Sequence, residues 1–279
     1  MNARLEIGFQ TCGGRTLLRL GAQQPPWRVI RAFSQENGSA LVHLHNVSGG
    51  VLAGDDLRLD IEVGPQARAQ VTSTGATRLY RHRGGMPDSE QGVSIRVAED
   101  GLLEYLPDAL IPFAGSRHRQ TTRIALAEGA TLFGWEMVAP GRQAMGECFR
   151  FERLRLATRI DSPRGPVFRE DLLLEPETAA LTSPARLGEY THTATFYAIQ
   201  IGRPAADLIA LERQLSEIAV RESRHGCTIW GTSALASDGV VVKGLSTSAH
   251  RIPATLAGFW SAARRFLTGD APVPPRKLK

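Results

Sequence analysis

Three glutamates stand out because each lies in an apolar stretch that otherwise has the composition of a buried strand. Glu104 lies within residues 102–106, Glu136 lies within residues 132–138, and Glu170 comes shortly before a run of leucines. Burying an unpaired carboxylate is costly or raises its pKa, so each acid needs either a partner or access to water.

Two interpretations of these acids remain open at this point. In the first, arginines such as Arg123, Arg142 or Arg169 neutralise them, or the strands simply face solvent. In the second, half-buried acids line a wet internal passage for a divalent cation. Carboxylate oxygens bind such ions without the closed cage that cysteine and histidine form.

A histidine pair offers a second possible metal contact. His43 and His45 are two residues apart in a probable strand, so their side chains share a face. Imidazole suits nickel, zinc and copper, but two ligands do not make a tight site. A hydrogen-bonded structural role is therefore the alternative for both residues.

The segment after this pair is rich in glycine. Gly49, Gly50 and Gly54 permit unusual backbone conformations, and Asp55 can close a turn through its side chain. A glycine loop that cradles phosphate needs a following helix or a nearby lysine, and a strand follows here. The loop is therefore predicted to be a structural turn.

Arginine dominates the basic residues. The chain of 279 residues has 33 basic and 28 acidic side chains, a net charge of +5, and lysine only at positions 243, 277 and 279. Arginine forms forked bonds to carboxylates, which favours acidic protein partners. Aromatic residues make up only 6% and form no RNP-like strand motif, so no nucleic-acid partner is expected.

Other classes are excluded more directly. Three distant cysteines allow neither a disulfide framework nor a CxxC metal knuckle. No stretch approaches the ~20 apolar residues of a membrane span, and the charged first 30 residues do not resemble a signal peptide. The common catalytic cassettes are missing as well. The sequence predicts a soluble, cytoplasmic protein that does not bind membranes.

The elements that must position these residues have a period of two for most of the chain. Residues 57–63 alternate apolar and charged side chains, as expected for a strand with one buried face. Segments 61–72, 95–106 and 124–136 each have the pattern strand, short turn, strand. This repeat suggests stacked strand pairs in a β-helix-like layer, with ordinary meanders as the alternative.

Two segments follow the helical period instead. Residues 204–221 and 256–267 place their apolar side chains on one face, and Gly269 follows the second segment. Asp238-Gly239 predicts a hairpin between them. The prediction is a single mainly β domain, residues 1–279, with layered β-helix-like sheets and two amphipathic helices in the C-terminal third.

Several motifs in sequence order resemble the UreD family, also called UreH, of urease accessory proteins. They cover essentially the whole chain and comprise residues 48–55, 74–81, 103–108, the Gly-Trp-Glu at 134–136 with Gly141-Arg142 and Gly146-Glu147, and 269–276. The chain departs from the family pattern at Val47-Ser48, at Ala53, at Ala139-Pro140, where a cysteine is common, and in the tail 277–279.

The resemblance implies a non-enzymatic maturation factor with a β-rich fold. It implies a dimeric heterocomplex with the accessory protein UreF and the GTPase UreG that bridges to apo-urease. No cofactor is expected to bind tightly. Nickel is expected in transit through an internal passage to the urease active site.

Specific residues follow from the same resemblance. The positions that match the passage are Thr77, Glu136 and Glu170, and we add Glu104 because of its apolar surroundings. Candidates for partner contact are Arg78, Tyr80, Arg81 and Arg276.

Two other function classes remain as alternatives. An all-β carbohydrate-acting enzyme would need two carboxylates ~5–10 Å apart in an open cleft lined with aromatic residues. An RNA-binding module would show binding that weakens steeply with salt.

Overall fold

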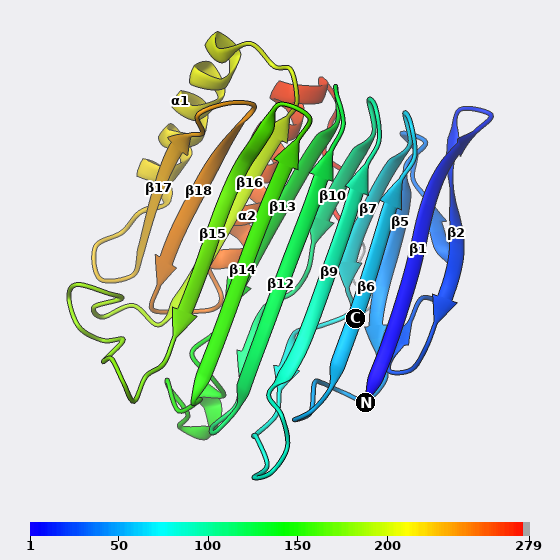
Figure 1. Ribbon diagram of the computed structural model, residues 1–279. Helices are drawn as coiled ribbons and strands as arrows, with labels where there is room; N and C mark the ends of the chain where they lie inside the picture. The colour runs from blue at the N-terminus through cyan, green and yellow to red at the C-terminus, as the bar shows by residue number, and fades with distance from the viewer. Residues whose placement is uncertain (276–279) are drawn as a thin grey trace.

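Two β-sheets packed face to face form the body of the molecule (Figure 1). The computed structural model describes residues 1–275, so Arg276 lies outside the described residues. The smaller sheet has seven strands in the order β15-β14-β12-β9-β6-β1-β2. Its strands are β1 (Asn2–Cys12), β2 (Arg15–Gln23), β6 (Asp56–Val63), β9 (Ser89–Val97), β12 (Arg117–Leu126), β14 (Arg153–Ser162) and β15 (Gly165–Leu174).

The larger sheet has eleven strands, and its main path runs β17-β18-β16-β13-β10-β7-β5-β3. The strands of this path are β3 (Trp27–Arg28), β5 (Ala40–Asn46), β7 (Arg68–Ser73), β10 (Leu102–Leu106), β13 (Thr131–Val138), β16 (His192–Gln200), β17 (Thr228–Ala234) and β18 (Gly239–Ser246). Three short strands pair alongside it: β4 (Ala32–Ser34), β8 (Thr77–Leu79) and β11 (Leu110–Pro112).

The chain passes repeatedly from one sheet to the other. Each predicted strand–turn–strand unit contributes one strand to each sheet, as β6–β7, β9–β10 and β12–β13, and equivalent strands pair in parallel. The turns stack as well, since the amide of Gln66 donates to Glu99 O (3.0 Å) and that of Asp100 donates to Glu128 O (3.2 Å). The layered, β-helix-like prediction is confirmed.

Side-chain alternation divides the interior into two cores. In β6, Leu57, Leu59, Ile61 and Val63 are buried between the sheets, while the charged residues between them face outward. The second core lies between the larger sheet and the helices. It contains side chains on the helix-facing side of the larger sheet, such as Phe133, Trp135 and Phe196.

The two predicted helices are present, and both cover the larger sheet (Figure 1). Helix α1 (Ala205–Glu222) buries Leu208, Leu211 and Leu215 on one face. Helix α2 (Ile252–Thr268) ends at Gly269, whose φ of 75° is the left-handed conformation typical of a helix end. β17 and β18 form the predicted antiparallel hairpin.

Candidate functional site

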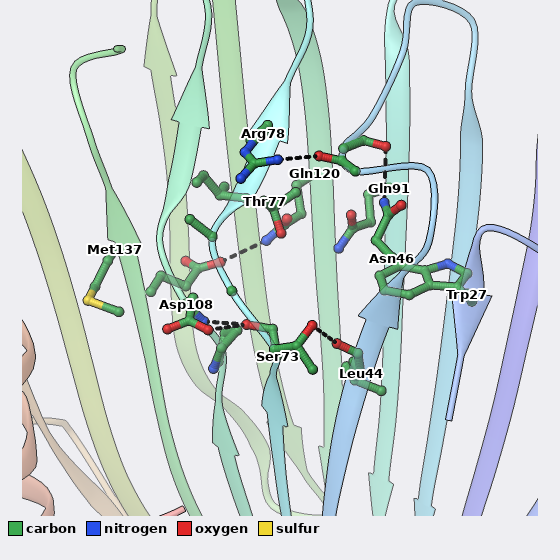
Figure 2. Close-up of a pocket in the computed structure, with 18 of the residues that line it drawn as sticks. Trp27, Leu44, Asn46, Ser73, Thr77, Arg78, Gln91, Asp108, Gln120 and Met137 are labelled. Carbon is green, nitrogen blue, oxygen red and sulfur yellow. Dashed lines mark hydrogen bonds between the residues drawn. The ribbon is translucent and has the colours of Figure 1, made fainter. Parts of the chain in front are cut away.

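A cavity of about 280 Å³ lies between the two sheets (Figure 2), and we call it the main cavity because both Thr77 and Glu136 line it. Both sheets supply its lining, since Thr77 and Glu136 come from the larger sheet and Gln91 and Gln120 from the smaller one. Thr77, Gln91 and Gln120 lie close together in Figure 2. Hydroxyl, amide and carboxylate groups therefore line a space that strand alternation would otherwise fill with apolar side chains.

The sequence Gly134-Trp135-Glu136 in β13 directs Glu136 toward this cavity and Trp135 to the opposite face. Trp135 faces the helices, and its Nε1 donates to Pro107 O at 2.8 Å. Gly134 is on the face of β13 that looks toward the smaller sheet. An added Cβ at this position would lie 2.2 Å from the ring of Tyr197, which is directly opposite Gly134 in the neighbouring strand β16. Glycine thus leaves space for that tyrosine, and Glu136 points into the cavity beside it.

Glu136 is held by two side chains of the smaller sheet. Gln120 Nε2 donates to Oε1 at 3.1 Å, and Thr158 Oγ1 donates to Oε2 at 3.3 Å. Burial raises the pKa of Glu136, and these two hydrogen bonds oppose the rise because they favour the ionised form. The carboxylate is oriented by polar contacts but has no ion-pair partner of its own among the described residues.

Several other polar atoms between the sheets have no protein partner among residues 1–275. They are Gln91 Oε1, Thr122 Oγ1 and the hydroxyl of Tyr197. In folded proteins buried polar atoms of this kind are usually satisfied by ordered water. The interior is therefore suited to a hydrated or hydrophilic guest rather than to an apolar ligand.

Two further cavities share lining residues with the first or with each other. A constriction of about 20 Å³ is lined by polar and apolar side chains, namely Glu136, Glu170, Thr193, Thr195, Val138, Leu156 and Leu172. An open cavity of about 620 Å³ is bordered by the same Glu170, Thr193 and Thr195. Thr77 and Glu136 line the first cavity, Glu136 and Glu170 line the constriction, and Glu170 lines the open cavity, so neighbouring cavities share lining residues.

Two rows of polar residues in register lie near the constriction and contribute Glu136, Thr195 and Glu170 to its lining. In the larger sheet, Glu136 of β13 is directly opposite Thr195 of β16, and Thr195 is directly opposite Lys243 of β18. In the smaller sheet, Thr158 of β14 is directly opposite Glu170 of β15. Period-two alternation turns all of these side chains toward the space between the sheets.

Lys243 is a site residue that our sequence reasoning missed. Its Nζ forms an ion pair with Glu170 across the two sheets and lies 3.4 Å from Thr195 Oγ1. Burial lowers the pKa of Lys243, while the charge of Glu136 opposes that shift. One sequence feature could have identified it: it is the only lysine before the tail, and it directly follows the valines at 240–242.

Glu104 does not join this set. The alternation along β10 turns it toward α2, where Arg264 Nε lies 2.6 Å from Oε1 and Gln70 Nε2 lies 2.5 Å from Oε2. Trp260 Nε1 also donates to Oε1, at 3.3 Å. The alternative that arginine neutralises a buried acid therefore describes Glu104, although the arginine is one that we did not predict.

His43 and His45 also lie away from the cavities. They alternate with Val42 and Leu44, which belong to the core between the sheets, so the histidines face the other side of β5. The ring of His43 packs edge-on against Phe33, with 5.6 Å between centroids. Burial lowers the pKa of His45, and His43 adds to this shift. Among residues 1–275, no group of three or more His, Cys, Asp or Glu could hold a metal ion.

Comparison with known proteins identifies the family. A family model described as UreD urease accessory protein matches residues 1–279. A urease accessory protein UreD of Herpetosiphon aurantiacus is 40% identical over 278 residues, covering 100% of this chain and 96% of the relative. The chain belongs to the UreD family.

Two other relatives carry the same name. The one from Alkalilimnicola ehrlichii is 34% identical and covers 98% of this chain and 89% of its own. The one from Cenarchaeum symbiosum is 31% identical and covers 96% and 93%. The resemblance drawn from the motifs is therefore confirmed. No helix within residues 1–275 is sufficiently long and apolar to cross a membrane.

The glycine-rich motif at residues 48–55 of this UreD-family chain forms a turn that packs on β8. Asp55 accepts from the amide of Leu52 at 2.9 Å and from the N-terminal ammonium at 3.0 Å. At Gly50 an added Cβ would lie 2.5 Å from Arg78 O, so a side chain there would separate the turn from β8. Gly49 and Gly50 also border the main cavity, whereas Gly54 precedes Asp55 with a φ of 76°.

The partner-contact candidates of this UreD-family chain lie near the same loop. Arg78 is exposed beside the main cavity, and its Nη1 is 3.4 Å from Gly49 O. Tyr80 packs edge-on against Phe113 at 5.1 Å, and with Arg81 it borders a shallow surface pocket. The Arg142 guanidinium lies 4.3 Å from the Phe113 ring centroid in that pocket.

Proposed function

We propose that this chain is a urease maturation factor that bridges a UreF–UreG complex to apo-urease and conducts nickel through its interior. Membership of a family of urease accessory proteins supports a role in urease maturation. The observation that supports the nickel proposal is a set of three cavities that share lining residues and are lined in turn by Thr77, Glu136 and Glu170.

The chemistry of the lining fits an ion that must enter and leave again. The residues described around the three cavities include carboxylates, hydroxyls and amides but no cysteine or histidine. Thiolate and imidazole groups hold Ni²⁺ strongly, whereas isolated oxygen ligands hold it weakly. Conduction requires sites weak enough to release the ion to the next one.

The constriction sets the step at which nickel would lose water. A space of about 20 Å³ holds roughly one water molecule, so a fully hydrated cation does not fit. Glu136 and Glu170 both line it, and their carboxylates would replace the lost water ligands. The passage would thus select for small cations that accept oxygen ligands.

The bridging part of the proposal relies on exposed surface near the main cavity. Arg78 and Arg81 provide positive charge beside that cavity and the surface pocket next to it. Forked guanidinium groups recognise carboxylates well, so we expect an acidic protein surface there. Such a partner would cover the cavity where nickel enters or leaves.

The decisive experiment combines Glu136→Gln with Glu170→Gln. Because the double variant removes both carboxylates but keeps their size, it should still co-purify with UreF and UreG. The nickel content of urease matured with it should fall by about tenfold, as for lost metal partners elsewhere. Elemental analysis of purified urease measures this directly.

A matched control is Glu62→Gln, because Glu62 is an exposed glutamate on the outer face of the smaller sheet. It should leave nickel content unchanged. Full nickel loading by the Glu136→Gln/Glu170→Gln variant would rule out transit between these carboxylates.

A further inference from the structure

The ion pair between Lys243 and Glu170 lies at the junction of the constriction and the open cavity. Glu170 borders both spaces, and Lys243 borders the open one. The pair joins β15 of one sheet to β18 of the other across the interior. A cation that binds Glu170 through Oε1 must therefore displace the ammonium group, which contacts that oxygen.

The identity of the cation in this pair is unusual for the molecule. Every other ion pair between side chains of residues 1–275 uses arginine, as in Arg155 with Asp171 and Arg264 with Glu104. Arginine binds a carboxylate through a planar fork, whereas the lysine ammonium is a single point charge on a flexible stem. Lysine is thus the more easily displaced of the two.

Lys243 also has space to move. Its side chain is 52% exposed, and the open cavity of about 620 Å³ lies beside it. The four-carbon stem can swing into that space without disturbing β18, which remains paired on both sides with β16 and β17. Glu170 would then be free to bind an incoming ion.

We propose that the Lys243 ammonium is a built-in competitor that occupies Glu170 between transits and weakens divalent-cation binding there, so that nickel is released rather than retained. The inference rests on the proposed nickel passage. It assigns to Lys243 the role of keeping divalent cations weakly bound at Glu170. Charge is the physical basis, because the ammonium cancels the negative charge of Glu170 and repels a second cation nearby.

The test is nickel binding to the full chain, measured by equilibrium dialysis with Ni²⁺ alone. Lys243→Met keeps the length of the side chain but removes its charge, so Ni²⁺ affinity should rise by about tenfold. Lys243→Met/Glu170→Gln should return to the parental affinity, because the liberated carboxylate is gone. Lys243→Arg should bind Ni²⁺ no more tightly than the parent.

Unchanged affinity in Lys243→Met would overturn the proposal, as would tight binding that persists in the double variant. Lys243→Gln provides a second uncharged variant if the methionine variant does not fold, and the same increase is expected. Failure of the passage itself would look different. Urease would then load fully with the Glu136→Gln/Glu170→Gln variant, whatever the dialysis shows for Lys243.

Discussion

Glu104 and Glu136 belong to neighbouring strands, yet their carboxylates have opposite surroundings because they face opposite sides of one sheet. Glu104 meets a guanidinium and an indole beneath α2, and Glu136 meets an amide and a hydroxyl between the sheets. The first arrangement pairs a buried carboxylate with a buried guanidinium. The second leaves Glu136 without an ion-pair partner among the described residues, which suits the proposed passage of an ion.

The pairing of Glu104 with Arg264 gives a test of stability. Glu104→Leu should lower the free energy of unfolding by about 3 kcal/mol, because it removes the nearest carboxylate from a buried guanidinium that keeps only the longer contact to Asp270 at 3.6 Å. The double variant Glu104→Leu/Arg264→Met should be more stable than Glu104→Leu alone. Urea denaturation measures both, and equal losses in the single and double variants would contradict the pairing.

His118 predicts a dependence of stability on pH. It is 1% exposed, its Nδ1 lies 2.9 Å from Ser89 Oγ, and burial lowers its pKa to about 4. In the unfolded chain this histidine has an ordinary pKa near 6.5. Between about pH 6.5 and pH 4 it is therefore protonated in the unfolded chain but neutral in the folded one. Stabilisation from this residue is therefore complete above about pH 6.5 and is lost as pH falls toward 4.

The variant His118→Gln isolates this contribution, since glutamine does not titrate. Between pH 7 and pH 4 the parent should lose up to about 3 kcal/mol more unfolding free energy than the variant. Urea midpoints at several pH values give the comparison. Parallel curves for the two proteins would show that His118 accepts a proton equally well in both states.

At the scale of the strand, β13 separates two tasks by alternation. Residues 133, 135 and 137 anchor the sheet to the helices, and residues 134, 136 and 138 face the smaller sheet. The Gly-Trp-Glu motif therefore combines a space for Tyr197, an anchor beneath the helices and a carboxylate in the cavity. Neither face of β13 can change without affecting one of these tasks.

Gly134→Ala tests the space that β13 leaves for Tyr197. The added methyl would lie 2.2 Å from the tyrosine ring, so the ring must shift, and overpacking of this kind costs about 1–3 kcal/mol. Thermal unfolding should show a clear loss. Gly231→Ala in β17 is the matched control, because nothing lies within 4 Å of the added carbon, and its stability should stay close to that of the parent.

At the scale of the whole molecule, local patterns predicted more than long-range ones. The stacked units and both helices were predicted because period and turn residues are local. Which residues of β10 face the helices and which face the smaller sheet was not predicted. All five residues of β10 are buried, so no alternation of buried and exposed residues distinguishes its two faces. Glu104 was therefore assigned to the wrong side of the sheet.

The ion pair Lys243–Glu170 joins residues that are 73 positions apart in the sequence. It forms only because β16 pairs antiparallel with β13 and β18 pairs antiparallel with β16, which brings Lys243 to the correct place in the larger sheet. No local feature sets that pairing. Thr77, Glu136 and Glu170 came from family resemblance, and the structure adds the cavities that these residues line.

The late position of β16 and β18 in the chain has a consequence for synthesis on the ribosome. The stacked strand–turn–strand units through β13 are complete by residue 138. The strands β16 and β18, which carry Thr195 and Lys243, join the larger sheet only afterwards. A nascent chain that stops before residue 192 leaves Glu136 on an edge strand, open to stray cations and to pairing with other chains. Translation must therefore pass residue 200, the end of β16, before β13 is covered at its edge, and residue 243 before Glu170 gains its ion-pair partner.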